Sequence, residues 1–351
     1  MLILPALLLL LGLSSTPPWA LALQTGVRGA RIPRSPSMAV ASGLGEIAHE
    51  YDAFLIDQWG VMHDGTNPYP GAVDCLAQLA AAGKKIVLLS NSSKRKGPAM
   101  TNLQKMGFDT SCIIDVVTSG DVAWEGIRME EQEEGGGGGG LRCLVLGSGA
   151  GDEEYVSSMG CRMADAGEAD LVLARGSFVM AGASGVLSFS PNVMGQKEVE
   201  RALDETRRRN VPMLVTNPDF LRPGTNDPMP GLLGRAYEAA GGHVEYVGKP
   251  HGLVYQECFR ALQVASGAAT PPPPPGRCCM VGDSLAHDIL GAARAGIASA
   301  FVTGGVHAQA LGLAQGSGRG LEDAGRRLPA LYEEHLPEGV APTHAVPGFV
   351  W

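Results

Sequence analysis

The sequence lacks any Cys-x-x-Cys pair, and its seven cysteines are an odd number. A chain of 351 residues can bury a sizeable core, so it does not need the disulfides that hold small secreted domains together. We therefore interpret the cysteines as free thiols in a reducing compartment. A zinc site or a disulfide is the alternative, although the spacing that such sites show is missing.

An excess of positive charge is also missing, since 27 Lys and Arg face 36 Asp and Glu, for a formal net charge of -9. An acidic chain gains nothing from attraction to a phosphate backbone, which argues against non-specific binding of nucleic acid. A small anionic substrate stays compatible with this charge, because local lysines and metal ions decide the potential of a site. Hydrophobic residues make up 45% and charged residues 18%, as in a globular protein with a packed core.

The apolar run near the N-terminus is too short to span a bilayer comfortably. It covers Leu2–Leu13 and has the length of a signal-peptide core, with a small residue at Ala20 where cleavage could follow. The stretch after it contains arginine and serine but no acid, as in transit peptides. We predict a bipartite plastid leader over residues 1–44, with no membrane span after its removal. The alternatives are simple secretion, or a cytoplasmic protein that starts at Met38.

Apolar runs alternate with helical patterns along the rest of the chain, and the runs end in polar residues. This order predicts a doubly wound α/β fold with a parallel sheet, in which ligands bind at the carboxyl ends of the strands. A glycine tract, Gly135–Gly140, and a proline tract, Pro271–Pro275, are read as surface insertions. The predicted strands are 51–56, 85–89, 141–146, 211–215, 244–247 and 279–281, and the predicted helices are 72–82, 98–106 and 198–209.

Four polar segments follow predicted strands and together suggest phosphoryl chemistry. Asp57 and Asp283 offer the hard oxygen ligands that suit Mg²⁺. Lys249 offers a positive charge that can pair with Asp57 and neutralise a phosphate, and Ser90 offers a hydroxyl donor. A carboxylate beside a metal ion and a lysine is a plausible nucleophile. Each residue alone is more often a turn former or a helix cap, but all four in this order make that interpretation unlikely.

These segments resemble the motifs of the haloacid dehalogenase superfamily of phosphohydrolases, and more narrowly its class IIA subfamily. The resemblance runs from about Glu46 to about Gly305. It implies a Rossmann-like parallel core with an inserted α/β cap domain of the C2 type. The implied boundaries are a first core segment over 45–118, a cap over 119–246 and a second core segment over 247–351. A homo-oligomer formed through the cap is a further option.

The resemblance also implies a role for each matching residue. Asp57 would be the nucleophile and a metal ligand, and Lys249 the motif lysine. Ser90 and the backbone of Asn91 would hold the phosphoryl group. Asp283 would bind Mg²⁺, supported by the carboxylate of Asp288. In the segment Thr216-Asn217-Pro218-Asp219, the residues Asn217 and Asp219 would face the substrate and set specificity.

Trp59 departs from the family pattern, which places a second aspartate two residues after the nucleophile. The backbone carbonyl of Trp59 can still bind the metal, as that position does in the family. The indole cannot protonate a leaving group or activate water, so efficient hydrolysis of unactivated monoesters is in doubt. His63 or Asp64 could replace the acid, although a loop histidine is the simpler interpretation of His63.

Three functions follow from these residues. The first is a magnesium-dependent phosphatase that acts on a small phosphorylated metabolite through an aspartyl-phosphate intermediate. The second is a catalytically weak binding or regulatory protein that keeps the fold, which Trp59 favours. The third is a nucleotide-binding oxidoreductase built on Gly147-Ser148-Gly149-Ala150-Gly151, where a turn in the cap is the better explanation.

Overall fold

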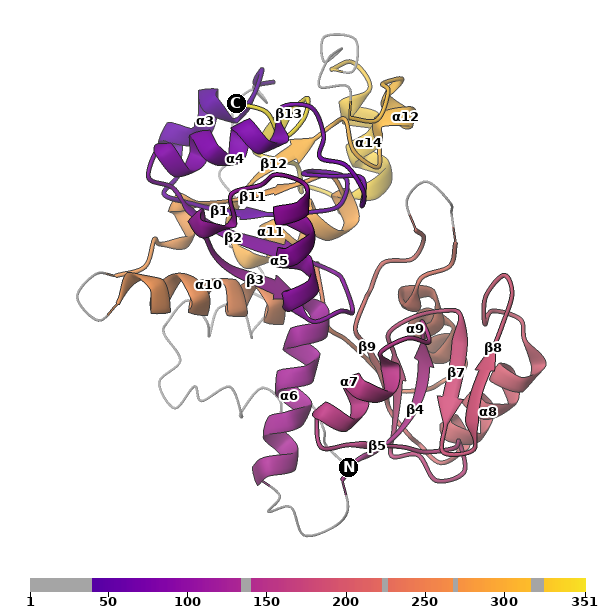
Figure 1. Ribbon diagram of the computed structural model, residues 1–351. Helices are drawn as coiled ribbons and strands as arrows, with labels where there is room; N and C mark the ends of the chain where they lie inside the picture. The colour runs from indigo at the N-terminus through magenta and orange to yellow at the C-terminus, as the bar shows by residue number, and fades with distance from the viewer. Residues whose placement is uncertain (1–39, 134–139, 223–226, 268–270, 317–324) are drawn as a thin grey trace. The chain divides into compact units, whose positions relative to one another are not determined.

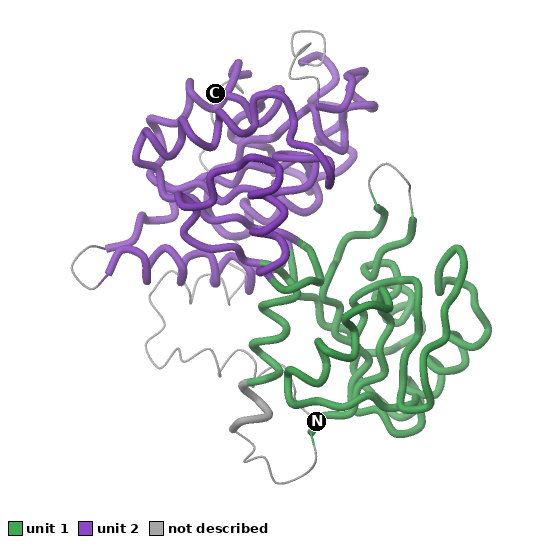
Figure 2. Tube along the Cα trace, viewed as in Figure 1, with its two compact units in different colours: residues 1–16, 91–95, 118–248 green, residues 17–90, 96–117, 249–351 purple. Residues whose placement is uncertain are grey.

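The computed structural model describes residues 40–133, 140–222, 227–267, 271–316 and 325–351. The chain forms two compact units, drawn in purple and green in Figure 2. The core unit comprises the described parts of 17–90, 96–117 and 249–351, and the cap unit comprises 91–95 and the described parts of 118–248. Most of the predicted leader and of the glycine tract lies outside the described residues.

The core unit contains a six-stranded sheet in the order β13-β12-β11-β1-β2-β3 (Figure 1). The pairs from β13 to β2 are all parallel, as the sequence predicts. The β1 strand lies in the middle because it is wholly apolar and buried, whereas a parallel edge strand would leave its backbone groups unpaired. The strands are β1 (Ala53–Ile56), β2 (Lys85–Ser90), β3 (Ile113–Thr118), β11 (Cys278–Gly282), β12 (Ala298–Val302) and β13 (His344–Val346).

Helices cover both faces of this sheet, as a doubly wound fold requires. On one face, Phe54 and Ile56 of β1 pack with Leu76 and Leu79 of α4 and with Leu103 of α5. The α10 helix packs against β2 and α11. The helical segments are α3 (Leu44–Ile47), η1 (Ala48–Glu50), α4 (Ala72–Ala81), α5 (Lys96–Lys105), η2 (Thr110–Cys112), α10 (Gly252–Ser266), η3 (Pro275–Arg277), η4 (Leu285–Ile289), α11 (Leu290–Ala295), α12 (Ala308–Leu311) and α14 (Leu328–His335).

The cap unit contains a mixed sheet in the order β10-β9-β6-β4-β7-β8, with β5 beside β4. The β10, β9, β6, β4 and β5 strands are parallel to one another, whereas β7 pairs antiparallel with β4 on one side and with β8 on the other. The strands are β4 (Arg142–Gly147), β5 (Arg162–Met163), β6 (Leu171–Ala174), β7 (Val179–Gly182), β8 (Gly185–Ser188), β9 (Met213–Val215) and β10 (Val244–Tyr246). The helices are α6 (Ser119–Glu133), α7 (Asp152–Ser158), α8 (Lys197–Arg208) and α9 (Pro230–Ala239).

The folded core begins a few residues earlier than the predicted boundary at Gly45. Val40 pairs with Ala345 of β13, and Ala41 and Leu44 are buried in the core. The backbone N–H of Leu44 also donates to the carbonyl of Val350 at 2.7 Å. Residues 40–44, which the sequence analysis assigns to the leader, therefore belong to the fold, because their apolar side chains fill space beside β13.

The segment Asn91–Arg95 also differs from its predicted place in the first core segment, because it clusters with the cap unit. The amide nitrogen of Asn91 donates to Asp219 at 2.8 Å, and Arg95 forms an ion pair with Asp121. These contacts join residues that are distant in sequence, which local patterns do not reveal.

The glycine-rich loop after β4 is a structural turn. The Asp152 carboxylate accepts a hydrogen bond from the N–H of Gly149 at 2.7 Å and pairs with Arg175. A β-carbon on Gly147 would overlap this same carboxylate. The N–H of Gly149 and the space beside Gly147 are thus taken by a negative side chain of the protein itself, which disfavours binding of a nucleotide phosphate at this turn.

Among the described helices, none combines the length and apolar character that a bilayer crossing requires.

Candidate active site

Asp57 and Asp283 lie side by side because they follow neighbouring parallel strands. Ile56 of β1 is paired with Val281 of β11, and the N–H of Asp57 donates to the carbonyl of Val281 at 2.9 Å. The carboxyl ends of parallel strands meet at one edge of a sheet, where side chains of several strands converge. The strand register therefore brings together two carboxylates that are far apart in the sequence.

Lys249 connects this pair to a third carboxylate. Its ammonium nitrogen lies 2.7 Å from Oδ1 of Asp57 and 2.7 Å from Oδ1 of Asp288. The lysine is 2% exposed, so both ion pairs are shielded from water. Burial lowers the pKa of Lys249, but the charges of Asp288 and Asp57 outweigh this effect and raise it. The lysine is therefore held as a cation at neutral pH.

Asp288 is positioned by the wide helical turn η4. This turn is closed by a hydrogen bond from the N–H of Ile289 to the carbonyl of Ser284, five residues earlier, and single turns of this kind are frequent at functional sites. The Asp288 carboxylate accepts the N–H of Ser284 at 2.9 Å. A β-carbon on Gly282 would overlap Asp288, so this strand residue leaves the space that the carboxylate occupies.

Asp283 is held by backbone groups that the sequence analysis did not single out. The N–H of Val306 donates to Oδ2 of Asp283 at 2.8 Å. A β-carbon on Gly60, which has a φ of 82°, or on Gly305 would overlap this carboxylate. At both glycines the backbone can approach the Asp283 carboxylate closely. For Gly305, the sequence signal was the Gly304-Gly305 pair that follows the apolar run of β12.

The cluster carries more negative than positive charge. Carboxylate oxygens of Asp57, Asp283 and Asp288 all lie within 4.8 Å of one another, with Lys249 as the cation that bridges two of them. Burial raises the pKa of Asp57 to about 7, against the lowering effect of Lys249. Burial, with the charges of Asp57 and Asp288, raises the pKa of Asp283 well above its ordinary value. A divalent cation would relieve this repulsion.

The donor set fits a hard divalent cation. The ligand atoms are carboxylate oxygens, which Mg²⁺ and Ca²⁺ prefer, and neither cysteine nor histidine takes part in the cluster. Asp288 already binds Lys249 and the Ser284 N–H. Oδ1 of Asp283, in contrast, accepts no hydrogen bond from the described residues. Asp57 and Asp283 are accordingly the side chains that would hold the cation.

Ser90 is the last residue of β2, the strand next to β1, and Asn91 follows it. Ile56 is paired with Leu88, so Ser90 extends past the point where Asp57 leaves its strand. Asn91 is counted with the cap unit, where its amide binds Asp219. Asn217 in turn accepts the N–H of Asp219 at 3.0 Å, so the two predicted specificity residues are linked in one turn.

Trp59 stands in a compact turn after Asp57 and faces a loop. The carbonyl of Gln58 accepts hydrogen bonds from the N–H groups of Val61, Met62 and His63. Trp59 and His63 form an isolated β-bridge. The indole lies close over Gly65, where a β-carbon would come within 3.3 Å of its Nε1. The side chain at this position is therefore packed on the loop that follows and offers no acidic proton.

His63 and Asp64 build the same loop. Nδ1 of His63 accepts the N–H of Gly65 at 3.0 Å, and burial lowers the pKa of this histidine. The Asp64 carboxylate is exposed and accepts the N–H groups of Thr66 and Asn67 at 2.8 and 2.7 Å. Hydrogen bonds from Asn67 and Thr66 lower the pKa of Asp64, so it is ionised at neutral pH. The hydrogen bonds of both residues stabilise this loop, and the ionised Asp64 has no proton to donate at neutral pH.

Comparisons with known proteins agree with this geometry. Residues 54–162 match the family model described as haloacid dehalogenase-like hydrolase, and residues 246–318 match a second model, HAD-hydrolase-like. Chronophin from Mus musculus is 28% identical over 271 residues, which cover 76% of this chain and 85% of chronophin.

Solved structures of the same family share the fold. A haloacid dehalogenase-like hydrolase from Brucella suis has a TM-score of 0.66 and 24% identity, covering 89% of this chain and all of its own. The p-nitrophenyl phosphatase from Archaeoglobus fulgidus has a TM-score of 0.61 and 20% identity, covering 86% and 97%. A glycerol phosphate phosphatase from Mycobacterium tuberculosis, in complex with calcium, has 26% identity and a TM-score of 0.52, covering 74% and 68%.

The two family models lie on the two chain segments that supply the carboxylate cluster, with Asp57 in the first and Lys249, Asp283 and Asp288 in the second. The chain therefore belongs to the haloacid dehalogenase-like hydrolases, as an enzyme of the phosphohydrolase type.

Proposed function

We propose that this protein is a magnesium-dependent phosphatase that acts on small phosphorylated metabolites through a phosphorylated Asp57. The observation that carries the proposal is the buried Asp57–Lys249 ion pair beside Asp283. A pure binding protein has no need of a carboxylate so placed, which disfavours the regulatory alternative. The phosphatases among the similar structures bear the names of small esters, p-nitrophenyl phosphate and glycerol phosphate.

In the proposed reaction, a carboxylate oxygen of Asp57 attacks the substrate phosphorus, and the bond from phosphorus to the leaving oxygen breaks. Lys249 lowers the pKa of Asp57 against the effect of burial, and it offsets the charge of the phosphoryl group. The Ser90 hydroxyl and the Asn91 N–H would hold the phosphoryl oxygens. Water then cleaves the aspartyl phosphate to inorganic phosphate and regenerates Asp57. Mg²⁺ bound to Asp57, Asp283 and the Trp59 carbonyl would supply neutralisation of phosphoryl charge.

Residue 59 is a tryptophan and cannot donate a proton to the leaving group. We propose that the enzyme prefers substrates whose leaving groups are already stable as anions, because Trp59 and Asp64 supply no proton in the described structure. Asn217 and Asp219 stay the predicted residues for substrate choice.

A screen of phosphate monoesters, acyl phosphates and pyrophosphates with Mg²⁺ tests the proposal. We expect release of inorganic phosphate from at least one class, together with a hydroxylamine-sensitive phosphoenzyme that is missing in Asp57→Asn. A fully active enzyme that forms no phosphoenzyme on rapid quenching would overturn the covalent route. Lack of turnover of every class would instead support the binding protein.

A further inference from the structure

The two residues that we propose to hold the phosphoryl group are divided between the two units. Ser90 ends β2 in the core unit, whereas Asn91 begins the segment Asn91–Arg95, which clusters with the cap unit. The backbone N–H of Asn91 therefore lies at the peptide bond where the chain passes from one unit to the other. The contacts that hold this segment in the cap unit thus bear directly on the proposed reaction.

The backbone of this segment is held by the start of α6. The carbonyl of Ser92 accepts the N–H of Gly120 at 3.0 Å, and the carbonyl of Lys94 accepts the hydroxyl of Thr118 at 2.8 Å. A β-carbon on Gly120 would overlap the carbonyl oxygen of Ser93, so the segment passes directly over this glycine. These contacts give the segment a defined path along the cap unit.

The side chain of Asn91 is fixed by a carboxylate. Asn91 is 6% exposed, and its amide nitrogen donates to Oδ1 of Asp219 at 2.8 Å. An ionised carboxylate only accepts hydrogen bonds, so this contact sets which end of the amide faces Asp219. Hydrogen bonds with an ionised partner are also stronger than those between neutral groups. Asp219 thereby holds the side chain of the residue whose N–H would bind the phosphoryl group.

The turn that carries Asp219 is itself held in place. The N–H of Asp219 donates to Oδ1 of Asn217 at 3.0 Å, and its carbonyl accepts the N–H of Gly231 of α9 at 3.0 Å. A β-carbon on Gly231 or on Gly248 would overlap Pro218, so both glycines permit the chain to pack closely around the turn. The carboxylate of Asp219 is therefore a fixed point within the cap unit.

Charge favours an action of Asp219 through Asn91 over direct contact with the phosphoryl group. A phosphoryl group is anionic, and two negative charges repel each other at short distance. An ionised carboxylate also has no proton to donate to a phosphoryl oxygen, whereas the N–H of Asn91 does. The carboxylate can thus help to bind the phosphoryl group only by orienting the residue that donates to it.

We infer that Asp219 is a positioning residue for the proposed reaction, because it fixes Asn91 so that the backbone N–H of Asn91 meets the phosphoryl oxygens. This inference rests on the proposed phosphatase function, and it adds to the role in substrate choice that is expected of Asp219. Positioning affects all substrates, since they share the phosphoryl group, whereas substrate choice affects different substrates by different factors.

Steady-state kinetics of the full chain with p-nitrophenyl phosphate and acetyl phosphate test the inference. Asp219→Ala should lower kcat/KM for both substrates, on the order of 10- to 100-fold, because a misplaced binding group slows the reaction. Asn91→Ala should cause a loss of similar size. The double variant should be no slower than the slower single variant, because both changes break the same contact. Asp219→Asn retains an acceptor oxygen for the amide of Asn91 and should recover most of the loss.

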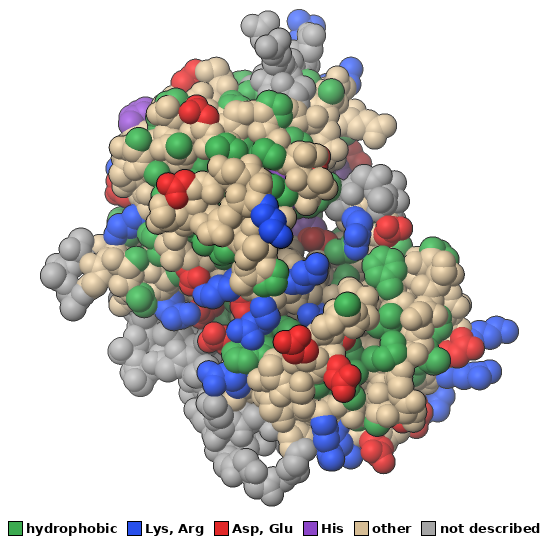
Figure 3. Space-filling view, in the orientation of Figure 1, with side chains coloured by type: hydrophobic (Ala, Val, Ile, Leu, Met, Phe, Trp, Pro, Cys, Tyr) green, Lys and Arg blue, Asp and Glu red, His purple; other side chains and the backbone are tan. Residues whose placement is uncertain are grey.

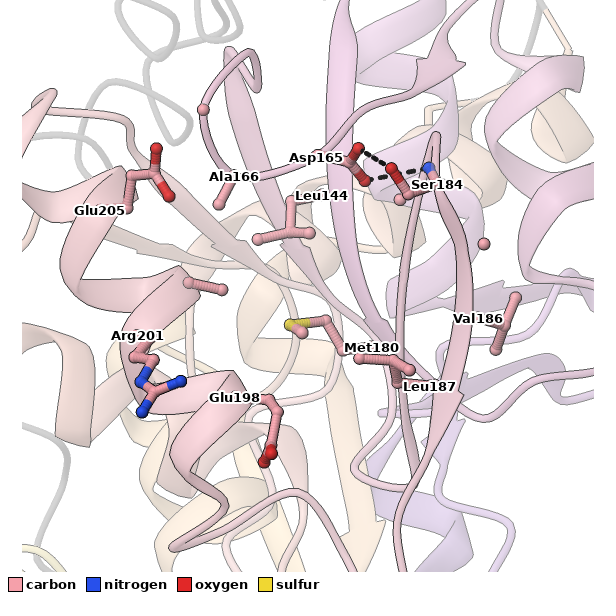
Figure 4. Close-up of a pocket in the computed structure, with 14 residues that line it drawn as sticks. Leu144, Asp165, Ala166, Met180, Ser184, Val186, Leu187, Glu198, Arg201 and Glu205 are labelled. Atoms are coloured by element: carbon pink, nitrogen blue, oxygen red, sulfur yellow. Dashed lines mark hydrogen bonds between the residues drawn. The ribbon is translucent and has the colours of Figure 1, made fainter.

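Glu198→Ala is the matched control. Acidic and basic side chains lie next to each other on the visible face of the cap unit (Figure 3), so the loss of one acid there changes the charge as Asp219→Ala does. Glu198 is exposed on α8 and lines a cavity of about 440 Å³ beside the β7–β8 hairpin (Figure 4). Neither the segment Asn91–Arg95 nor the turn of Asp219 lines this cavity. The kcat/KM of Glu198→Ala should therefore equal that of the wild type.

An exchange of the two side chains replaces Asp219→Ala if that variant does not fold. Asn91→Asp alone would set two carboxylates against each other and should lower kcat/KM. The addition of Asp219→Asn restores an amide–carboxylate contact with the partners reversed, so kcat/KM should rise about tenfold above that of Asn91→Asp. Circular dichroism and urea unfolding of each variant separate loss of the fold from loss of positioning.

Three results would overturn the inference. These are additive losses in Asp219→Ala and Asn91→Ala, a loss in Asp219→Asn as large as that in Asp219→Ala, or equal activity of Asp219→Ala and Glu198→Ala. Any of them in an otherwise active enzyme refutes the role of Asp219 alone. A wild type that releases no phosphate from any substrate class refutes the proposed function as well, so the two failures are distinguishable.

Discussion

The ammonium group of Lys249 lies 2.7 Å from the carboxylate of Asp57, and the same group lies 2.7 Å from the carboxylate of Asp288. Lys249 therefore pairs with two carboxylates. We propose Asp57 as the nucleophile, and Asp288 is wholly buried. A buried pair that loses one partner leaves an uncompensated charge, which is costly. This arrangement allows the nucleophile to be removed while Lys249 keeps a counter-charge.

Asp57→Asn should therefore abolish turnover and preserve the fold. The covalent route disappears, so kcat/KM should fall by several orders of magnitude. Asp288 still compensates Lys249, and the thermal midpoint should change little. Phosphate release and circular dichroism measure the two effects. Activity near that of the wild type would exclude Asp57 as the nucleophile.

Removal of the metal should stop the reaction and lower stability. Three buried carboxylates repel one another, and a cation that binds only the folded state stabilises it by about 2.7 kcal/mol at one hundred times its Kd. Chelation with EDTA should abolish activity and lower the thermal midpoint, and added Mg²⁺ should restore both. In Asp283→Ala, Mg²⁺ should no longer raise the midpoint. Full activity in excess EDTA would contradict the metal requirement.

Gly305→Ala should weaken metal binding, although Gly305 is not itself a proposed metal ligand. The added methyl group would overlap the Asp283 carboxylate and push it from its place. Residues that orient a ligand typically affect metal affinity about 10- to 100-fold, and a loss of this size is expected in a Mg²⁺ titration of activity. Gly276→Ala is the control, because no atom lies within 4 Å of the added group. Equal Mg²⁺ affinity in both variants would show that Asp283 does not bind the metal.

The leaving group should govern the rate, because Trp59 provides no acid. A general acid contributes about 10²- to 10⁴-fold when the leaving oxygen needs a proton, and little when it does not. Aryl, acyl and anhydride phosphates should thus have a much higher kcat/KM than alkyl phosphates. Comparison of p-nitrophenyl phosphate with an alkyl phosphate measures this difference. Equal rates would show that another residue donates the proton.

Stability should depend on pH through His307. Burial, with the nearby His335 and His287, lowers the pKa of His307 from 6.5 to about 4. Below about pH 6.5 the unfolded chain binds a proton that the folded protein excludes, so stability falls as the pH drops toward 4. The full effect of such a shift is about 3 kcal/mol.

Urea unfolding at pH 7 and pH 5 measures this dependence. His307→Gln should reduce the difference between the two pH values, because glutamine does not titrate. His243→Gln is the matched control, since the side chain of His243 is 67% exposed. If His307→Gln and the wild type lost the same stability between the two pH values, His307 would not be the responsible group.

The sequence predicted the parallel core and its strands β1, β2 and β11, because buried parallel strands are almost continuously apolar. The strands β3, β12 and β13 of the same sheet were not among the predicted strands. The runs that became β1, β2 and β11 are each followed by a polar residue, and parallel pairing places these ends at one edge. The same logic located Asp57 and Asp283 from the order of residues alone. The resemblance to the haloacid dehalogenase superfamily, which the family models confirm, agreed with this pattern.

Local patterns did not predict the β7–β8 hairpin. Its β8 strand is exposed at every position, so it has neither the alternation of a half-buried strand nor the apolar run of a buried one. The Asp152 carboxylate, which fills the glycine loop, likewise depends on how the chain turns after β4. The fold also decides the exposure of β8 and the ion pair of Asp152 with Arg175, which lies 23 residues later in the sequence.

The sequence by itself determined which residues could carry the chemistry, since residue type and position at a strand end suffice to nominate Asp57, Lys249 and Asp283. Only the tertiary structure decided that Lys249 serves two carboxylates, and that the indole of Trp59 packs over Gly65. The reason is physical: strand ends follow from local hydrophobicity, whereas ion pairs and packing depend on distances between residues that the fold alone brings together.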